Sequence, residues 1–582
     1  MIGRFISELK RRNVLRLGAF YAGFSWLLVQ VATQVFPFFG IPDLVVRIVV
    51  VSLVVALPFV LLFGWFYELT PDGLKLESEI DRNQPISHST GSRLDRWLVV
   101  VLSLAVVLLL VDKLLLRNDV PPAEKSIAVL PLLSHGSEAD AYLADGLSEE
   151  LISQLTQLDG LKVIGRASSF QFREAQSDLR RIGELLGVST LLTGSLRRQA
   201  GQLRVVAELV RIEDGRALWS QTYERNADDV FAVQTDIAHA VAAALEVQLL
   251  APADRPIYKP DPRAHELVLE AHVRYATSSQ AELLKARDLY QQAIVIDPGY
   301  AEAHAWLANT WRVLMVEMED LDSVNRARDQ AKAAIARAVQ LDEHNGIVQS
   351  IHGIILMDLD FDLAGARRAL TRAVELNPGA EATRFMAYVL ATAGEFEQAE
   401  AYFQRAMKLD PLQGRVLAMM TEVMLLPLRR YDEAERAMQR ARSLPLKTVQ
   451  IERVRTSLAI LRGDAQQALE LATSMPPDNF WRQFYQALAL SMGDERAAAD
   501  AALQALIAEQ GEIAAYQIAE IHAFRGETDR AFEWLQRAQQ LDDPGLMGLL
   551  CSAYLMPLRD DPRFDALRRK VGLPQPPPLP AT

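Results

Sequence analysis

The residues whose types and spacing could do chemistry begin with three neighbouring acids, Asp145, Glu149 and Glu150. Carboxylates this close can act as a general acid and a general base. The same pattern also starts a helix, because Asp145 can cap it and the two glutamates favour the positive end of its dipole. We expect helix capping here, with a paired-acid site as the alternative.

The other candidate nucleophiles and ligands are weaker signals. His265 and His272 stand seven residues apart on an expected helix, but they lack a third metal ligand. Ser7 and Lys10 match a Ser-x-x-Lys pattern without an expected domain around them. The sequence has no phosphate loop, nucleophile elbow or His-Glu-x-x-His motif. The lone Cys551 excludes an internal disulfide and a multi-cysteine zinc cluster. We therefore expect no catalytic residue, no metal and no cofactor.

The acids belong to a segment, residues 119–250, in which strand and helix patterns alternate. Short apolar runs bounded by turn formers predict strands, and longer periodic runs predict helices. Arg197 and Arg198 could bind an anion, although solvated charges at a strand edge are the expected reading. The strands are expected at 126–132, 161–164, 189–197, 203–212 and 217–223, and the helices from 145, over 179–186 and over 230–249.

Five stretches of this segment together form a recognisable pattern: SIAVLPL, YLADGLSEELISQL, LKVIGRASSFQF, RRIGELLGVSTLLTGSLRR and RALWSQTYERNADDVFAVQTDIA. In this order they resemble the periplasmic TolB-type amino-terminal domain. The resemblance implies a small α/β domain used for assembly or sensing, with no catalytic residues to carry over. The chain departs from the family at 132–134, where Leu-Leu-Ser replaces a frequent Phe and Asn. A ligand role for that loop therefore does not follow.

From about residue 262 to 545, alanine recurs at a nearly regular interval. It stands at 286, 331, 366, 399, 434, 468, 498 and 531, and a second alanine follows seven residues later in all repeats but one. Positions seven apart lie on one face of a helix, where a small side chain lets neighbouring backbones approach. We predict about eight stacked helical hairpins. The repeat-packing positions are Ala286, Ala366, Ala399, Ala406, Ala434 and Ala531.

A period near 34 residues resembles the tetratricopeptide repeat, and the segment 380–411 is its best copy. This resemblance implies an array that binds extended peptides or partner helices in a concave groove lined by the first helix of each pair. Counting from the alanines predicts that Asn309, Arg312, Arg384 and Tyr388 face the groove, with plain surface positions as the alternative. We also expect an insertion near 315–324, a helical cap at 546–574 and a disordered tail at 575–582.

The first 118 residues are strongly apolar. They predict a cytoplasmic stub at 1–16 and a membrane module at 17–118 with three spans at about 17–39, 45–67 and 97–116. The third run could instead be a buried core helix. The stretches ELKRRNVLRLGAFYAGFSWLLVQV and GWFYELTPDGLKLE resemble the membrane module often found ahead of TolB-type domains. Basic residues before the first span and in the second loop predict a cytoplasmic amino terminus and a periplasmic carboxyl-terminal bulk.

Composition limits the classes of partner. With 50% hydrophobic and 23% charged residues, the chain is not expected to be disordered. A net charge of −13 argues against a nucleic acid partner. The partners expected are therefore a protein or peptide in the periplasm and the lipid bilayer, and the oligomeric state stays open.

Together these patterns predict a multi-domain chain with a three-span α-helical membrane module, a small α/β domain and an all-α tetratricopeptide solenoid. We expect a multi-pass inner-membrane protein that acts as a periplasmic interaction scaffold and not as an enzyme. The first alternative is a transmembrane receptor that signals through the loop 68–96, and the second is an enzyme with its site in the α/β domain. Related chains often begin with a nucleotide cyclase or a winged-helix domain, but only about 16 residues precede the first span, and we expect neither.

Overall fold

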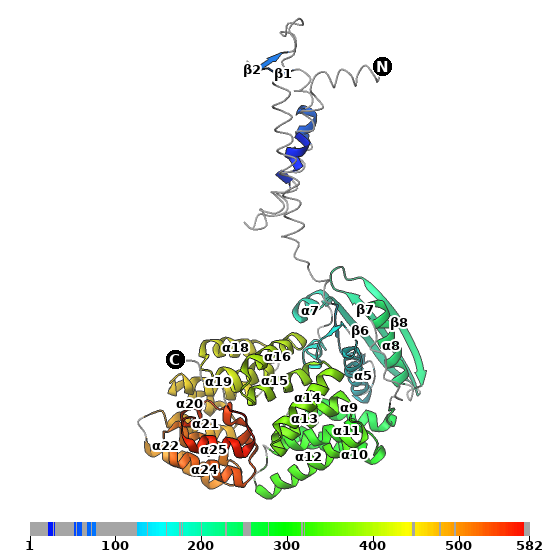
Figure 1. Cartoon of the computed structure of the whole chain (residues 1–582). Helices are drawn as coiled ribbons and strands as arrows, with labels where there is room; N and C mark the ends of the chain where they lie inside the picture. The colour runs from blue at the N-terminus through cyan, green and yellow to red at the C-terminus, as the bar shows by residue number, and fades with distance from the viewer. Residues whose placement is uncertain are drawn as a thin grey trace. The chain divides into compact units, whose positions relative to one another are not determined.

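The computed structural model describes residues 125–575, apart from short gaps of which 248–257 is the longest, and several short stretches between residues 21 and 76. The chain divides into two compact units, Met1–Ala123 and Glu124–Thr582. Figure 1 shows the elements of each unit. We describe the two units separately.

The first unit corrects the membrane prediction. Its described residues include helical stretches at 21–26 and 55–60, and an antiparallel hairpin of β1 (Tyr67–Thr70) and β2 (Gly73–Leu76). Tyr67, expected to end the second span, lies in a strand instead. Within these described stretches and the rest of the described chain, no helix has the length and apolarity needed to cross a membrane, which takes about 20 residues.

This finding contradicts the predicted three-span module, and with it the multi-pass inner-membrane location. The fold class is corrected to a helical repeat array that follows an α/β domain. The predicted span at 97–116 and the predicted stub at 1–16 lie outside the described residues.

The second unit begins with an α/β domain whose sheet has the strand order β5-β3-β6-β7-β8, with β4 also paired to β6. β3 runs parallel to β5 and β6, and β6, β7 and β8 form an antiparallel meander. This confirms the predicted antiparallel pair and the expected strands, except that the first, expected over 126–132, ends at Val129, and that β4 was not expected. Their bounds are β3 (Ser126–Val129), β4 (Leu133–Ser134), β5 (Lys162–Val163), β6 (Thr190–Gln199), β7 (Gln202–Arg211) and β8 (Ala217–Asn226).

Helices cover both faces of this sheet. α5 (Glu138–Thr156) and α8 (Val230–Ala244) pack on one face, and α7 (Leu179–Leu186) lies with a second apolar cluster that includes Leu191 of β6. The short α6 (Arg166–Ser169) follows β5. α7 has the predicted bounds because Asp178 accepts a hydrogen bond from the Arg181 amide at its start and Gly187 ends it in the left-handed conformation.

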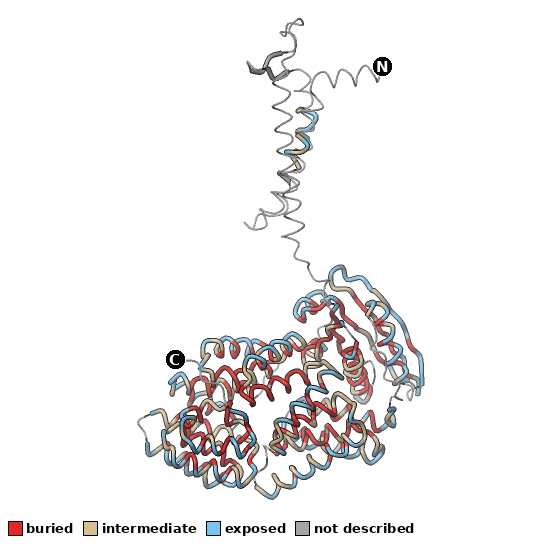
Figure 2. Tube along the Cα trace, in the orientation of Figure 1, coloured by how far each residue is buried: buried red, intermediate tan, exposed pale blue. Residues whose placement is uncertain are grey.

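Hairpins of α-helices make up the rest of the unit. In chain order they are α9 (Pro262–Thr277), α10 (Gln280–Ile296), α11 (Ala301–Leu314), α12 (Leu321–Leu341), α13 (Gly346–Asp360), α14 (Leu363–Leu376), α15 (Ala380–Thr392), α16 (Phe396–Leu409), α17 (Gly414–Met420) with the π-helical η7 (Thr421–Leu425), α18 (Tyr431–Ser443), α19 (Val449–Leu461), α20 (Ala465–Ser474), α21 (Phe480–Leu490), α22 (Arg496–Gln510), α23 (Ala515–Phe524) and α24 (Thr528–Gln540). The six alanines named for repeat packing are all buried with no exposed surface. Figure 2 shows this burial along the helix surfaces that face one another.

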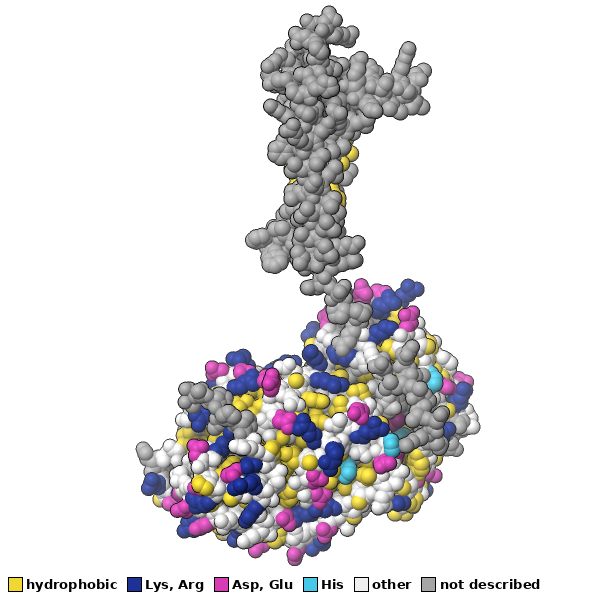
Figure 3. Space-filling view, in the orientation of Figure 1, with side chains coloured by type: hydrophobic (Ala, Val, Ile, Leu, Met, Phe, Trp, Pro, Cys, Tyr) yellow, Lys and Arg dark blue, Asp and Glu magenta, His cyan; other side chains and the backbone are white. Residues whose placement is uncertain are grey.

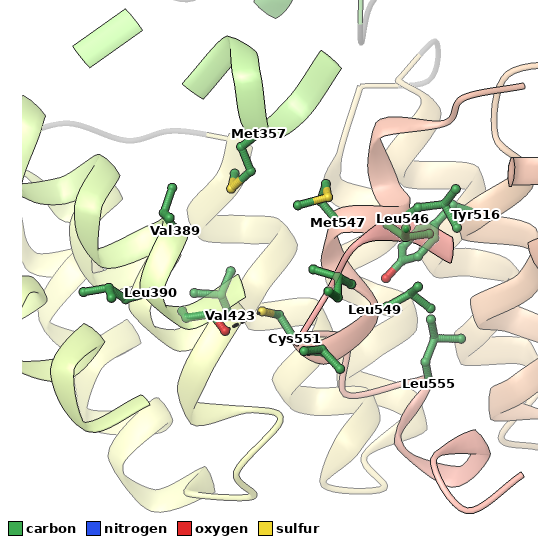
Figure 4. Packing of buried hydrophobic residues seen from close by; sticks show 14 of the residues in the cluster. Met357, Val389, Leu390, Val423, Tyr516, Leu546, Met547, Leu549, Cys551 and Leu555 are labelled. Carbon is green, nitrogen blue, oxygen red and sulfur yellow. Dashed lines mark hydrogen bonds between the residues drawn. The ribbon is translucent and has the colours of Figure 1, made fainter. Parts of the chain in front are cut away.

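The last segment, residues 544–573, folds back onto the middle of the array. It contains η8 (Pro544–Leu550), η9 (Met556–Leu558) and α25 (Pro562–Val571), and η8 contacts both α13 and α15. The Cys551 thiol donates to the Ala391 carbonyl at 3.1 Å, and Figure 4 shows Met547 and Leu549 beside Cys551 in the same apolar cluster as Met357 and Val423. Residues from the end of the array thus share one core with its third and fourth hairpins.

Candidate functional site

The first helices of the hairpins form a continuous layer, which we call the first-helix layer. Each of α11, α13, α15, α17, α19 and α21 contacts the first helix of the next hairpin. Burial raises the pKa of Tyr275 on α9, and the charge of Arg312 on α11 opposes that rise.

Two of the four predicted groove residues lie side by side on α11. Asn309 is only 1% exposed, and its side-chain amide donates to the Tyr275 hydroxyl at 2.9 Å. Arg312 donates through Nε to Asn309 Oδ1 at 3.0 Å and pairs with Asp358 of α13 at 2.9 Å. Burial raises the pKa of Asp358, and Arg312 opposes that rise. These contacts fix the direction of the Arg312 guanidinium group.

The other two predicted residues lie one turn apart on α15. Arg384 is 6% exposed, pairs with Glu381 at 2.5 Å and places its guanidinium carbon 4.2 Å from the centre of the Phe385 ring. Tyr388 is half-buried against the core cluster that contains Cys551, and burial, followed by the charge of Asp358, raises its pKa well above the ordinary value. Of the four predicted groove residues, Arg312 and Tyr388 are therefore partly exposed, whereas Asn309 and Arg384 are covered.

A second group of polar side chains lies on the same layer and was not predicted from the sequence. Arg453 of α19 pairs with Glu422 at 3.0 Å, and its guanidinium carbon lies 3.4 Å from the centre of the Trp481 ring. Gln450 donates to Glu422 at 3.2 Å. We call Glu422, Gln450, Arg453 and Trp481 the Arg453 patch; all four are partly exposed.

A sequence signal for the Arg453 patch did exist. Arg453 precedes Ala468 by the same 15 residues that separate Arg384 from Ala399, so both arginines occupy one position of the repeat. Trp481 carries no such signal, because the distance to the next alanine is different in its repeat.

The α/β domain docks against the array at α9 and at the end of α16. The Gly165 amide donates to the Leu409 carbonyl at 2.7 Å, the Ser168 amide donates to Asp410 Oδ1 at 2.7 Å, and the Leu412 amide donates to Ser168 Oγ at 2.8 Å. We call these bonds the Ser168–Asp410 contact. Burial raises the pKa of Asp410 to about 6, against the effect of its bonds to Ser168 and Gln413.

A second part of this junction joins α5 to α9. A Cβ on Gly146 would lie 2.1 Å from Leu269, so glycine permits the close approach of the two helices. Arg198 pairs with Glu266 of α9 at 2.6 Å and with Asp140 of α5 at 3.4 Å, so it links the domain to the array. The alternative of an anion site at this arginine gains no support from these contacts.

The three neighbouring acids Asp145, Glu149 and Glu150 lie on α5 at this junction, and their side chains do not pair with one another as a catalytic site would require. α5 begins at Glu138, so Asp145 lies inside the helix and bonds to Arg173; the capping prediction was wrong. Against the effect of burial, Arg166 at 2.9 Å and His272 lower the pKa of Glu149 to about 2. Burial, with the nearby Glu302, raises the pKa of Glu150.

The two histidines have structural surroundings. His265 Nδ1 lies 3.0 Å from the Tyr300 hydroxyl, and burial lowers its pKa to about 4. His272 lies 3.4 Å from Glu149, with its ring 4.8 Å from Trp306. Among the residues that the structure describes, no group of three or more His, Cys, Asp or Glu side chains could hold a metal ion.

Comparison with known proteins supports the repeat assignment. Residues 359–423, which contain α14, α15, α16, α17 and most of η7, match the family described as Tetratricopeptide repeat. The chain carries tetratricopeptide repeats. The named match covers part of the array, and the alternation of first and second helices continues on both sides of it.

One curated relative matches part of the chain. Putative adenylate cyclase 3 of Rhizobium meliloti (strain 1021) is 36% identical over 191 residues, which are 32% of this chain and 32% of that protein. The chain thus aligns with about a third of its relative's length.

Several solved structures are also similar to part of the chain, at low TM-scores. Pseudomonas aeruginosa pilF is 19% identical and covers 38% of this chain and 98% of its own, with a TM-score of 0.27. A tetratricopeptide repeat protein from Parabacteroides merdae ATCC 43184 is 14% identical; the match covers 53% of this chain and 99% of that protein, with a TM-score of 0.23. Yeast Tom70 is 14% identical; the match covers 60% of this chain and 97% of Tom70, with a TM-score of 0.26.

Proposed function

We propose that the tetratricopeptide array is a protein-interaction scaffold that binds a partner polypeptide at the Arg453 patch. The observation that carries this proposal is the stacking of Arg453 on Trp481 within the first-helix layer, where both side chains are partly exposed. Arginine and tryptophan are over-represented among the residues that dominate binding energies. The patch also offers a carboxylate and an amide, so it can bond to a peptide backbone as well as to side chains.

The location of the patch favours it over the groove predicted from the sequence. Around Asn309 and Arg384 the layer is already covered, and the α/β domain contacts α9 and the end of α16. The four side chains of the Arg453 patch belong to η7, α19 and α21, and all four are partly exposed. On the face of the molecule drawn in Figure 3, positively and negatively charged side chains are interspersed with hydrophobic ones.

Photo-crosslinking in cells tests this proposal. A photo-reactive residue replaces Gln450 in the patch or, as a matched control, the exposed Gln404 of α16. We expect one partner to be crosslinked from position 450 and not from 404, and Trp481→Ala to reduce its yield at least fivefold. Equal yields from both positions, or a yield that Trp481→Ala leaves unchanged, would contradict the proposal.

We also propose that residues 119–250 form a TolB-type domain that holds the array in one conformation. The sheet order and the five resembling stretches support this proposal, and the Ser168–Asp410 contact supplies the means. Hydrogen exchange of the full chain tests the second part: Ser168→Ala should increase exchange at the amides of 409–412, and unchanged exchange there would contradict it. We propose no receptor function, since that alternative required the membrane spans.

A further inference from the structure

One long edge of the sheet in the α/β domain is open. β8 has 10 residues and ends the strand order, and among the strands that the structure describes it pairs with β7 alone. Figure 1 shows β8 at the outer side of the sheet. All of its residues except Leu218, Trp219 and Tyr223 are exposed. An edge strand turns a row of N–H and C=O groups away from its sheet, so β8 offers these groups to another strand.

β8 lacks several features that keep edge strands from pairing with another chain. It contains no proline and no lysine, and it is longer than the usual strand of about five or six residues. The irregularity in its pairing with β7 lies at Leu209 and Val210, opposite the first residues of β8. From 220 to 226 the strand pairs with β7 without interruption. This part of the edge is therefore regular as well as exposed.

The side chains of β8 suit a second copy of the same strand. Two antiparallel strands related by a twofold axis place one residue opposite itself. With Thr222 at the axis, Arg225 lies opposite Trp219 of the second copy, and each such pair occurs twice. Glu224 then lies opposite Ser220, whose hydroxyl group can donate to the carboxylate. An axis at Glu224 or Arg225 would instead bring like charges together, which destabilises a pair of strands.

Arg225 and Trp219 have the exposure and the direction that this pairing requires. Arg225 has 48% of its side chain exposed, and its contact with Asp236 of α8 is long, at 3.9 Å. Trp219 is partly exposed, and its ring lies 6.4 Å from that of the buried Tyr223. Positions 219, 223 and 225 lie on one face of the strand, because side chains alternate along it. A guanidinium group can therefore stack on the exposed part of an indole ring that the core already holds in place.

We propose that the chain forms a symmetric homodimer by antiparallel pairing of two β8 strands, with Thr222 at the twofold axis. The two sheets then become one continuous sheet. Main-chain hydrogen bonds supply the affinity, and the Arg225–Trp219 pairs fix the register. This interface lies on the α/β domain and shares no residue with the Arg453 patch, so the dimer forms whether or not that patch binds a partner.

Disulfide formation at the axis tests the register. Directly opposite residues of antiparallel strands have Cα atoms about 4.5–5.5 Å apart, which a disulfide bond can span. We expect Thr222→Cys in the full chain to give a covalent dimer on mild oxidation, detected by non-reducing gel electrophoresis. Ser220→Cys is the matched control: it is also exposed, but its two copies would lie about 13 Å apart along the strands. The wild-type chain, whose lone Cys551 is 5% exposed, gives the background.

Sedimentation velocity over a series of protein concentrations measures the association itself. We expect the wild-type chain to form a reversible dimer. Arg225→Gln should raise its dissociation constant at least fivefold, because both contacts with Trp219 lose their charge. Arg216→Gln is the control, since Arg216 is exposed in the turn before β8 and outside the paired stretch, and it should associate as wild type. Circular dichroism checks that each variant is folded.

Three outcomes would overturn the proposal. The first is a wild-type chain that stays monomeric at all concentrations, which would leave the β8 edge to a strand of another protein. The second is crosslinking of Ser220→Cys as rapidly as Thr222→Cys, which would show random collision or another register. The third is a dimer whose dissociation constant is the same for Arg225→Gln and wild type, which would place the interface elsewhere on the chain.

Discussion

At the scale of single residues, most alanines at the predicted interval are buried in the structure. Ala399 and Ala406 are fully buried, as the interval predicted for a close contact between helices. The seventh repeat differs: Ala498 is half-buried and Ala505 exposed, whereas Ala499 and Leu506 are buried. The predicted positions in this repeat were therefore one residue too early. Because several alanines follow one another there, the spacing alone could not show which of them is buried.

Ala399→Leu tests the packing role of this column. Ala399 has no exposed surface and lies in the same cluster as Phe403, so a larger side chain must displace a neighbouring backbone. We expect the free energy of unfolding to fall by roughly 1–3 kcal/mol in denaturant titrations. Ala401→Leu on the exposed side of the same helix is the control and should change it little. Equal values for the two variants would show that the repeat register is wrong.

Glu520→Gln tests a buried carboxyl group that the sequence did not single out. Burial raises the pKa of Glu520 from 4.5 to about 8, and Ser552 donates to it at 2.6 Å. The folded chain therefore holds a proton that the unfolded chain releases, and its stability falls as pH rises from about 5 to 8. The slope from one such carboxyl group is at most about 1.4 kcal/mol per pH unit.

Glutamine cannot ionise, so the variant should lose this part of the slope and become relatively more stable at pH 8. Urea titrations between pH 5 and 9 measure the effect, with the exposed Glu397→Gln as control. A wild-type slope retained in Glu520→Gln would mean that the carboxyl group is already ionised at neutral pH.

At the scale of elements, local patterns predicted strands and helices better than they predicted how these pack on one another. The bounds of α7 and the antiparallel pair of β6 and β7 follow from apolar periodicity and turn residues close in the sequence. The start of α5 could not be predicted in this way. Asp145 is a residue type that often caps a helix, but here it lies inside α5 and pairs with Arg173. The Ser168–Asp410 contact joins residues 242 positions apart, and a single sequence carries no signal for such a pair.

Ser168→Ala tests the docking of the α/β domain. The substitution removes the hydroxyl that bonds both Asp410 and the Leu412 amide in a buried site. We expect a loss of about 1–3 kcal/mol in stability, because two buried polar groups lose a partner. Ser220→Ala on the exposed strand β8 should be neutral in the same denaturant titration. A neutral result for Ser168→Ala would show that the contact does not stabilise the docked domain.

At the scale of the whole molecule, the array is closed by its own end. Arg328 on α12 donates to the Asp542 carbonyl at 3.0 Å, and residues 544–573 contribute to the core of α13 and α15. The sequence predicted a helical cap at 546–574 but not its contact with the middle hairpins, since the path that returns it to them depends on the stacking of many repeats. The membrane prediction failed at this scale too, because apolar composition alone does not establish a continuous helix of the required length.

Leu549→Ala tests this closure. Leu549 has no exposed surface and lies in the cluster that joins the last segment to the middle hairpins. We expect a loss of about 2–5 kcal/mol, together with increased binding of an apolar fluorescent dye as the uncovered core contacts solvent. Val295→Ala, at a side chain that is 81% exposed, is the control. A dye signal equal to that of wild type would show that the segment stays in place without Leu549.

The return of the last segment also has a consequence during synthesis. The Ala391 carbonyl accepts a hydrogen bond from the Cys551 thiol, which is synthesised 160 residues later. At roughly 5–20 residues per second, a ribosome needs roughly 8–30 s to supply it. Throughout that interval the apolar sides of α13 and α15 stand open on the nascent polypeptide, so any product released early leaves them uncovered for chaperones and proteases to recognise.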